Sequence, residues 1–74
     1  MQVMPGQIWW RDYSNDYHSL IVKVLILDVN ESEIKSKILQ SNIEFRPVGA
    51  TITAFLHGEH ADKFHAINGW IRES

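Results

Sequence analysis

The longest apolar stretch of the chain runs from Leu20 to Leu27 and is interrupted only by Lys23. It is rich in isoleucine and valine and has turn-forming residues on both sides, so it predicts a strand over residues 19–29. Such a run is typical of a strand that is covered on both faces, or of a long strand that bends within a small barrel. We expect the lysine in its middle to extend its ammonium group to solvent from one edge.

Four further segments have features of strands. Residues 7–13 follow a Met-Pro-Gly turn and are rich in aromatic and β-branched side chains. Residues 50–56 alternate threonine with apolar residues, and residues 70–71 are expected to form a short final strand that returns to the first. A short edge strand is expected over residues 43–45. It ends before Pro47, because proline lacks the N–H group that a strand ladder needs.

Residues 31–41 fit two structures. After a hairpin turn that begins at Asn30, the segment from Glu33 to Ile38 alternates polar and apolar residues, as a half-exposed strand does. The same residues also suit a helix, with Asn30 as its N-cap and Glu33 paired with Lys37 one turn later. Only three apolar side chains would then face the core, which is a thin stripe for a helix. We therefore favour the strand, with an α+β fold that has a helix at about 31–41 as the alternative.

Residues 59–67 are expected to make one or two helical turns, with Phe64 and Ile67 facing inward. Asn68-Gly69 ends these turns, because both residues tolerate a positive φ. No repeat, low-complexity tract or linker divides the chain. The pattern therefore predicts a single small domain over residues 1–74. It is mainly β, a small antiparallel barrel of four or five strands with a short helical turn before the last strand.

Charge and cysteine content restrict the possible functions. The chain has 7 basic and 9 acidic residues, interleaved along its length, and a formal net charge of −2. Nucleic-acid-binding proteins usually have a basic excess, so this balance disfavours that class. The absence of cysteine excludes a disulfide framework and a thiolate zinc site. No apolar run approaches the roughly 18–20 residues of a membrane helix, so we expect a cytoplasmic protein without a membrane partner.

His57, His60 and His65 are the candidate metal ligands, because histidine is a preferred ligand of zinc and other divalent metals. His60 and His65 are five residues apart, which is about 140° around a helix, so one helical face does not hold both. We therefore interpret the three as surface histidines. Metal binding is kept as a weak alternative.

Asp12, Asp16 and His18 lie near the first predicted turn, and a carboxylate beside a histidine can tune the pKa of that histidine. In a polar turn, however, a short carboxylate side chain more often caps backbone N–H groups. The glycines stand alone, so no phosphate-binding loop is present. We therefore predict no catalytic residue and no cofactor.

The aromatic residues carry the strongest functional signal. Trp9 and Trp10 are adjacent, and adjacent side chains on a strand point to opposite faces, so only one indole can be central to the core. We expect the outward indole to form an exposed aromatic patch, and Trp, Tyr and Arg are the residues enriched at interface hot spots. The predicted protein-binding residues are Trp9, Trp10, Arg11, Tyr13, Tyr17 and Trp70.

The chain opens with Pro5-Gly6-Gln7-Ile8-Trp9, continues with a long apolar second strand and a polar third strand, and has Phe64 and Trp70 near its end. In these features it resembles the SH3-like small barrels. It also resembles the short proteins of phages and other mobile elements that often begin with this Pro-Gly-Gln-Ile-Trp sequence. The resemblance implies an SH3-like barrel that serves as a binding scaffold, and it transfers no catalytic residue.

We expect a non-enzymatic interaction module that binds another protein or a second copy of itself through the aromatic patch. A homodimer is expected because so short a chain supplies a thin core. By analogy with mobile-element proteins, the partner would be a host enzyme or defence complex that this protein blocks. One alternative is a nucleic-acid-binding barrel that uses the same aromatics with Arg11, Lys23, Lys35 and Lys37. The other is a metal-binding protein or enzyme built on the three histidines.

Overall fold

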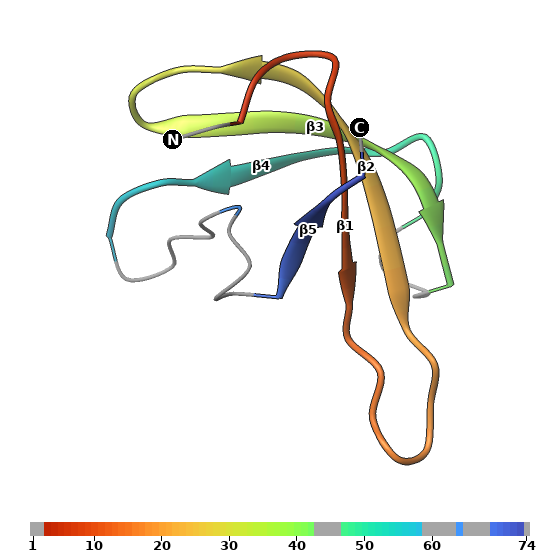
Figure 1. Cartoon of the computed structure of the whole chain (residues 1–74). Helices are drawn as coiled ribbons and strands as arrows, with labels where there is room; N and C mark the ends of the chain where they lie inside the picture. Colours follow the sequence, from red (N-terminus) through yellow and green to blue (C-terminus); the bar gives the residue numbers. More distant parts are fainter. Residues whose placement is uncertain (1–2, 43–46, 59–63, 65–68, 74) are drawn as a thin grey trace.

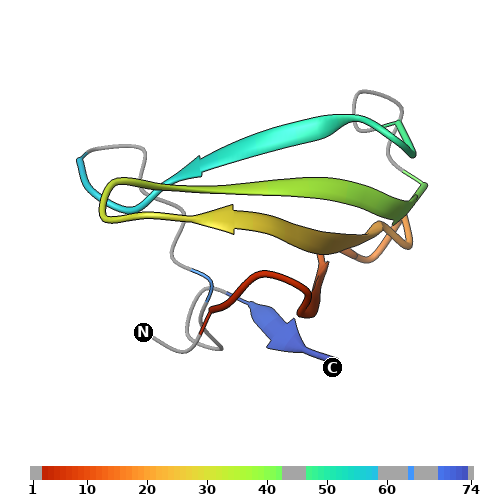
Figure 2. The ribbon, with the colours of Figure 1, turned by 90° about the horizontal axis from the view of Figure 1, so that it is seen from above.

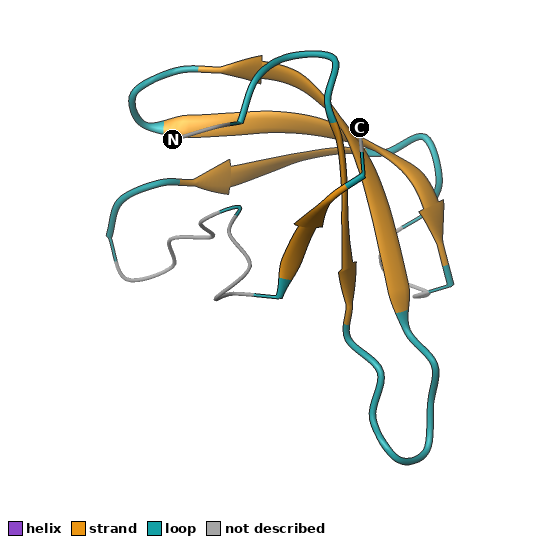
Figure 3. Ribbon diagram, viewed as in Figure 1, coloured by secondary structure: helices purple, strands orange, loops and turns teal. Residues whose placement is uncertain are grey.

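The computed structural model describes residues 3–42, 47–58, 64 and 69–73, and these form one antiparallel sheet of five strands (Figure 1). The order across the sheet is β4-β3-β2-β1-β5, so the first four strands form a meander and the last strand returns to pair with the first. The described residues contain no helix (Figure 3). The strands are β1 (Ile8–Asp12), β2 (Ile21–Val29), β3 (Glu33–Ser41), β4 (Thr51–Phe55) and β5 (Trp70–Arg72).

The prediction of a mainly β, small barrel-like domain of four or five antiparallel strands is therefore confirmed, and the number of strands in the described residues is five. The expected pairing of the final strand with the first is also confirmed. The predicted helical turn at 59–67 and the predicted edge strand at 43–45 lie outside the described residues, apart from Phe64, which is 2% exposed and faces inward as expected. Across the part of the chain that is described, no helix has the length and apolar content needed to span a lipid bilayer.

The alternative of a helix at 31–41 is wrong, because this segment is strand β3. Asn30 is used as a turn residue and not as a helix cap. Its Oδ1 accepts hydrogen bonds from the backbone N–H groups of Ser32 (2.9 Å) and Glu33 (2.9 Å), which closes the β2–β3 hairpin. Beyond the turn, β3 buries alternate side chains, including Ile34 and Ile38, which is the period of a strand.

Strand β2 is long and bent, as one of the two sequence interpretations expected. Its register with β3 shifts between Lys23 and Val24 and again between Ile26 and Asp28. Such irregularities bend a strand and increase its twist. As a result the sheet curls: β1 and β5 run at a steep angle to β4 in Figure 1, and the view from above shows β4 and β5 at opposite margins (Figure 2).

The concave side of the curled sheet, here called the inner face, holds the hydrophobic core. Three aromatic rings from distant parts of the chain meet there. The Trp9 and Phe64 rings lie edge to face with centroids 5.9 Å apart, and Phe64 stacks on Trp70 with centroids 4.3 Å apart. The buried apolar residues are Val3, Trp9, Val22, Val24, Ile26, Ile34, Ile38, Ala54, Leu56, Phe64 and Trp70.

The segment from Met4 to Gln7 forms a turn, and a hydrogen bond to this turn holds the Trp9 side chain in place. Gly6 has a φ of 89°, a left-handed conformation that suits glycine, and Gln7 N donates to Met4 O over 3.3 Å to close the turn. The Gln7 side chain is buried, and its Oε1 accepts hydrogen bonds from Met4 N (2.9 Å) and from the Trp9 indole Nε1 (3.0 Å). One buried amide therefore holds the turn and satisfies the only polar atom of the indole side chain.

A Gln7→Leu variant is expected to lower the free energy of unfolding by about 1–3 kcal/mol, because the buried indole N–H of Trp9 loses its acceptor. Urea denaturation followed by circular dichroism measures this change. Gln40→Leu is the matched control. Gln40 is exposed on β3, so its replacement is expected to change stability by no more than about 0.5 kcal/mol. Equal stability of the Gln7 variant and the unmodified protein would contradict the role of this amide.

Candidate interaction surface

The two adjacent tryptophans point to opposite faces of β1. Trp9 is 7% exposed and belongs to the core, whereas Trp10 lies on the convex side, here called the outer face, and is partly exposed. The prediction that only one of the two indoles is central to the core is therefore confirmed. Trp10 is the outward member, and the candidate site is built around it.

Strand register places apolar side chains around Trp10. Directly opposite partners in antiparallel strands share a face, and Trp10 pairs with Ile71 on β5 and with Lys23 on β2. Ile8 lies two residues before Trp10 and so on the same face, and its partner on β2 is Leu25. Ile71 is 45% exposed, and the other three apolar side chains are partly exposed. The Trp10 surface is defined here as Ile8, Trp10, Lys23, Leu25, Ile71 and Glu73.

An ion pair crosses the Trp10 surface. Lys23 Nζ lies 2.8 Å from Glu73 Oε2, with both side chains partly exposed. Lys23 is the partner of Trp10, and Glu73 N donates to Ile8 O over 2.7 Å. Since β1 lies between β2 and the chain that continues from β5, the ion pair passes over β1 between Ile8 and Trp10. A partly exposed pair adds little to stability, but it gives this apolar surface a polar component of defined position.

Trp70 does not belong to an exposed surface, so that part of the sequence prediction is wrong. Its side chain is 1% exposed, because pairing with Arg11 places it on the inner face, where it stacks on Phe64. Arg11 and Tyr13 are also on the inner-face side of β1, and the Arg11 guanidinium lies 4.5 Å from the centre of the Tyr13 ring. They are near the rim of the core and on the opposite side of the sheet from Trp10.

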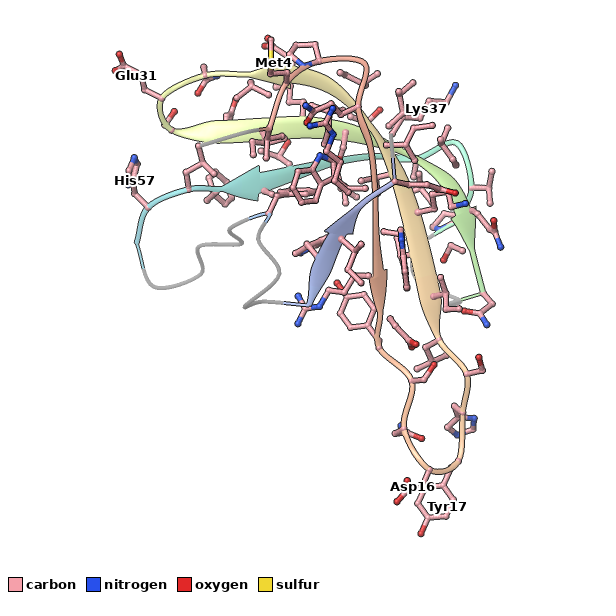
Figure 4. All side chains as sticks on the ribbon, in the orientation of Figure 1. Met4, Asp16, Tyr17, Glu31, Lys37 and His57 are labelled. Carbon is pink, nitrogen blue, oxygen red and sulfur yellow. The ribbon has the colours of Figure 1, made fainter. Side chains whose placement is uncertain are left out.

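Tyr17 lies at the tip of the long β1–β2 hairpin (Figure 4), beyond the ends of the two strands and so away from the Trp10 surface. It is 89% exposed, and the turn that carries it is closed by Asn15, whose Oδ1 accepts from the backbone N–H of Tyr17 (2.8 Å) and of His18 (2.9 Å). The six predicted binding residues are thus divided among the core, the inner-face rim, the outer face and the hairpin tip.

The Asp12 carboxylate has the turn-capping role expected from the sequence. Its Oδ1 accepts from Ser14 N over 2.8 Å, and hydrogen bonding by Ser14 lowers the pKa of Asp12 below its usual value. This stabilisation of the folded hairpin is present above the usual pKa of aspartate and is lost as the pH falls through the lowered value. The Asp12 side chain is exposed to solvent, and the role that the structure shows for it is to accept the hydrogen bond that closes this turn.

Of the three candidate metal ligands, only His57 is among the described residues. Its Nε2 lies 2.9 Å from the backbone oxygen of Glu31, so the imidazole joins the end of β4 to the β2–β3 turn (Figure 4). His60 and His65 lie outside the described residues. Within the described part of the chain, no group of three histidine, aspartate or glutamate side chains is placed to hold a metal ion.

Sequence reasoning found Trp10 but missed its neighbours Leu25, Ile71 and Glu73. The two-residue spacing of Ile8 and Trp10 was a usable signal for a shared face, whereas the pairing of β1 with β2 and β5 depends on register. Comparison of the chain with protein-family models, curated proteins and solved structures finds no match. What the Trp10 surface can bind therefore follows from its own side chains.

Proposed function

We propose that this protein is a non-enzymatic interaction module that binds a protein partner through the Trp10 surface. The observation that carries the proposal is the partly exposed indole of Trp10, framed by Ile8, Leu25 and Ile71 on a hydrogen-bonded sheet. Tryptophan is enriched among interface hot spots, and side chains held on a rigid sheet lose little freedom on binding. Aliphatic, aromatic and ion-paired side chains supply binding area and orientation rather than proton transfer.

The alternative of a nucleic-acid-binding barrel has less support. Of the four basic residues expected to act together, Arg11 lies on the side of the sheet opposite Trp10. Lys23 pairs with Glu73 at 2.8 Å, and Lys35 lies 4.0 Å from Glu33. Neighbouring carboxylates reduce the positive potential that phosphate binding requires. We therefore favour a protein partner. The likeness to proteins of phages and mobile elements makes a cytoplasmic host protein the first class to test.

A Trp10→Ala variant is expected to keep its fold and to raise the Kd for the partner at least tenfold, which corresponds to a loss of about 1.4 kcal/mol or more. The partner is first captured from a host extract on the unmodified protein. Its affinity is then measured with purified components for the unmodified protein, Trp10→Ala and Ile71→Asp. Ile71 is 45% exposed, so its replacement tests the same surface with little risk to the fold.

Gln40→Ala is the matched control, because Gln40 pairs with Lys23 in the same cross-strand row and is exposed. It is expected to leave the Kd within about twofold, since substitutions at the polar rim of an interface are nearly neutral. Unchanged affinity of both the Trp10 and Ile71 variants would refute the proposal. Binding of an oligonucleotide at low salt that weakens steeply as salt is added would instead support the nucleic-acid alternative.

A further inference from the structure

Strand β4 forms one margin of the sheet and pairs on one side with β3 (Figure 2). Two backbone hydrogen bonds flank the β3–β4 ladder: Ile38 N donates to Ala50 O, and Leu56 N donates to Ser32 O, each over 2.9 Å. Hydrogen-bonded pairs alternate along an antiparallel ladder. Even-numbered residues of β4 therefore bond to β3, and the odd-numbered ones direct their N–H and C=O groups away from it. These outward-directed residues are Thr51, Thr53 and Phe55.

This edge lacks the features that usually prevent strands from pairing between molecules. Protein sheets commonly protect their edges with charged side chains, proline, bulges or very short strands. The sequence of β4 is TITAF, five residues without charge or proline, and its register with β3 is regular. The opposite margin is different, because β5 has only three residues and includes Arg72. Thr51 and Thr53 are exposed and Phe55 is 53% exposed, so the outer-face side chains along this edge are open to solvent.

We infer that β4 binds the β4 strand of a second copy of this chain, in an antiparallel arrangement with a two-fold axis at Thr53. This register is the one that pairs all five residues of both strands. It places Thr53 opposite Thr53 of the other copy, and Thr51 opposite Phe55. Because these are the residues whose backbone groups point outward, each of the pairs is of the hydrogen-bonded type. The sheets of the two copies then form one continuous antiparallel sheet across the dimer.

The charges beside the edge are compatible with a second copy. On the outer face, the β3 partners of Phe55 and Thr51 are Glu33 and Lys37. The two-fold register joins these positions into a row that runs from Glu33 through Phe55 to Thr51 and Lys37 of the other copy. Each such row thus has opposite charges at its two ends. The central row has Lys35 at both ends, with the two Thr53 side chains between them, and each Lys35 lies 4.0 Å from Glu33 of its own chain.

The inference is separate from the proposed function, because β4 and the Trp10 surface lie on different strands of the sheet. Sedimentation equilibrium of the whole chain from about 1 µM to about 1 mM measures the dimer Kd. Thr53→Lys and Thr53→Glu are each expected to raise this Kd at least tenfold, because the two-fold register places like charges opposite one another. An equimolar mixture of the two variants is expected to recover the dimer, since lysine then faces glutamate.

Tyr17→Lys adds the same charge at the exposed hairpin tip and is expected to leave the dimer Kd unchanged, as is Trp10→Ala. Thr53→Pro is a second edge variant. It removes an N–H that does not bond to β3, and it is expected to abolish the dimer while cooperative unfolding is retained. The inference is overturned if the unmodified chain is monomeric at every protein concentration in this range. It is also overturned if the Thr53 variants have the same dimer Kd as the unmodified chain. It is also overturned if the mixture fails to restore the dimer.

Discussion

A Trp9→Ala variant is expected to lose a large share of its free energy of unfolding and to unfold at a much lower temperature than the unmodified protein. Trp9 is 7% exposed, its ring meets Phe64 edge to face, and its indole N–H is bonded to Gln7. Truncation of a buried tryptophan to alanine costs about 3–5 kcal/mol. A domain of 74 residues has a total stability of roughly 4–11 kcal/mol, so the loss removes a large share of it. Thermal denaturation followed by circular dichroism, with proton NMR dispersion as a second probe, measures the outcome.

Trp10→Ala is the matched control for this prediction, because it is the same chemical change at the next residue. Trp10 is partly exposed on the outer face, so its replacement removes less buried area and is expected to cost about 1–2 kcal/mol. The difference in the free energy of unfolding between the two variants thus shows how much more the inward side chain of β1 contributes to stability than the outward one. Equal destabilisation by both changes would mean that Trp10 is a second core residue, and the Trp10 surface would then lose its central side chain.

Side-chain direction within each strand was predictable from the sequence, because it depends only on the two-residue period of extended backbone. The opposite placement of Trp9 and Trp10 followed from this period, as did the alternation of buried and exposed residues in β3. The choice between strand and helix for residues 31–41 was harder, since Asn30 suits a hairpin turn and a helix cap equally. The segment is a strand because it pairs with β2 and β4. These pairings join residues that are distant in the sequence, so local sequence patterns do not predict them.

The neighbours of Trp10 were not predictable, because they come from strands whose register a single sequence does not specify. Leu25 reaches the surface through the β1–β2 register, and Ile71 reaches it through the return of β5 to β1. The burial of Trp70 has the same origin. The sequence prediction placed Trp70 in the exposed aromatic patch, but its pairing with Arg11 turns the indole into the core.

A chain that ends at Gly69 is expected to be unfolded. The deletion removes Trp70, which is 1% exposed and stacks on Phe64 with ring centroids 4.3 Å apart, so the aromatic centre of the core loses one of its three rings. It also removes β5 and thereby leaves the outer edge of β1 without a strand partner. The loss of the indole alone costs about 3–5 kcal/mol, to which the lost strand pairing adds. The predicted observations are a random-coil circular dichroism spectrum and narrow NMR dispersion.

A chain that ends at Arg72 is the control for this deletion, because it keeps β5 and removes the ion pair of Glu73 with Lys23 and the backbone hydrogen bond from Glu73 N to Ile8 O. A partly exposed ion pair contributes about 0–1 kcal/mol and a backbone hydrogen bond about 0.5–1.5 kcal/mol, so this shorter deletion is expected to unfold cooperatively with a lower midpoint. Cooperative unfolding of the chain that ends at Gly69 would contradict the role assigned to β5. In that case the sheet from β1 to β4 would be stable without the strand that brings Ile71 beside Trp10, and the Trp10 surface could be tested without β5.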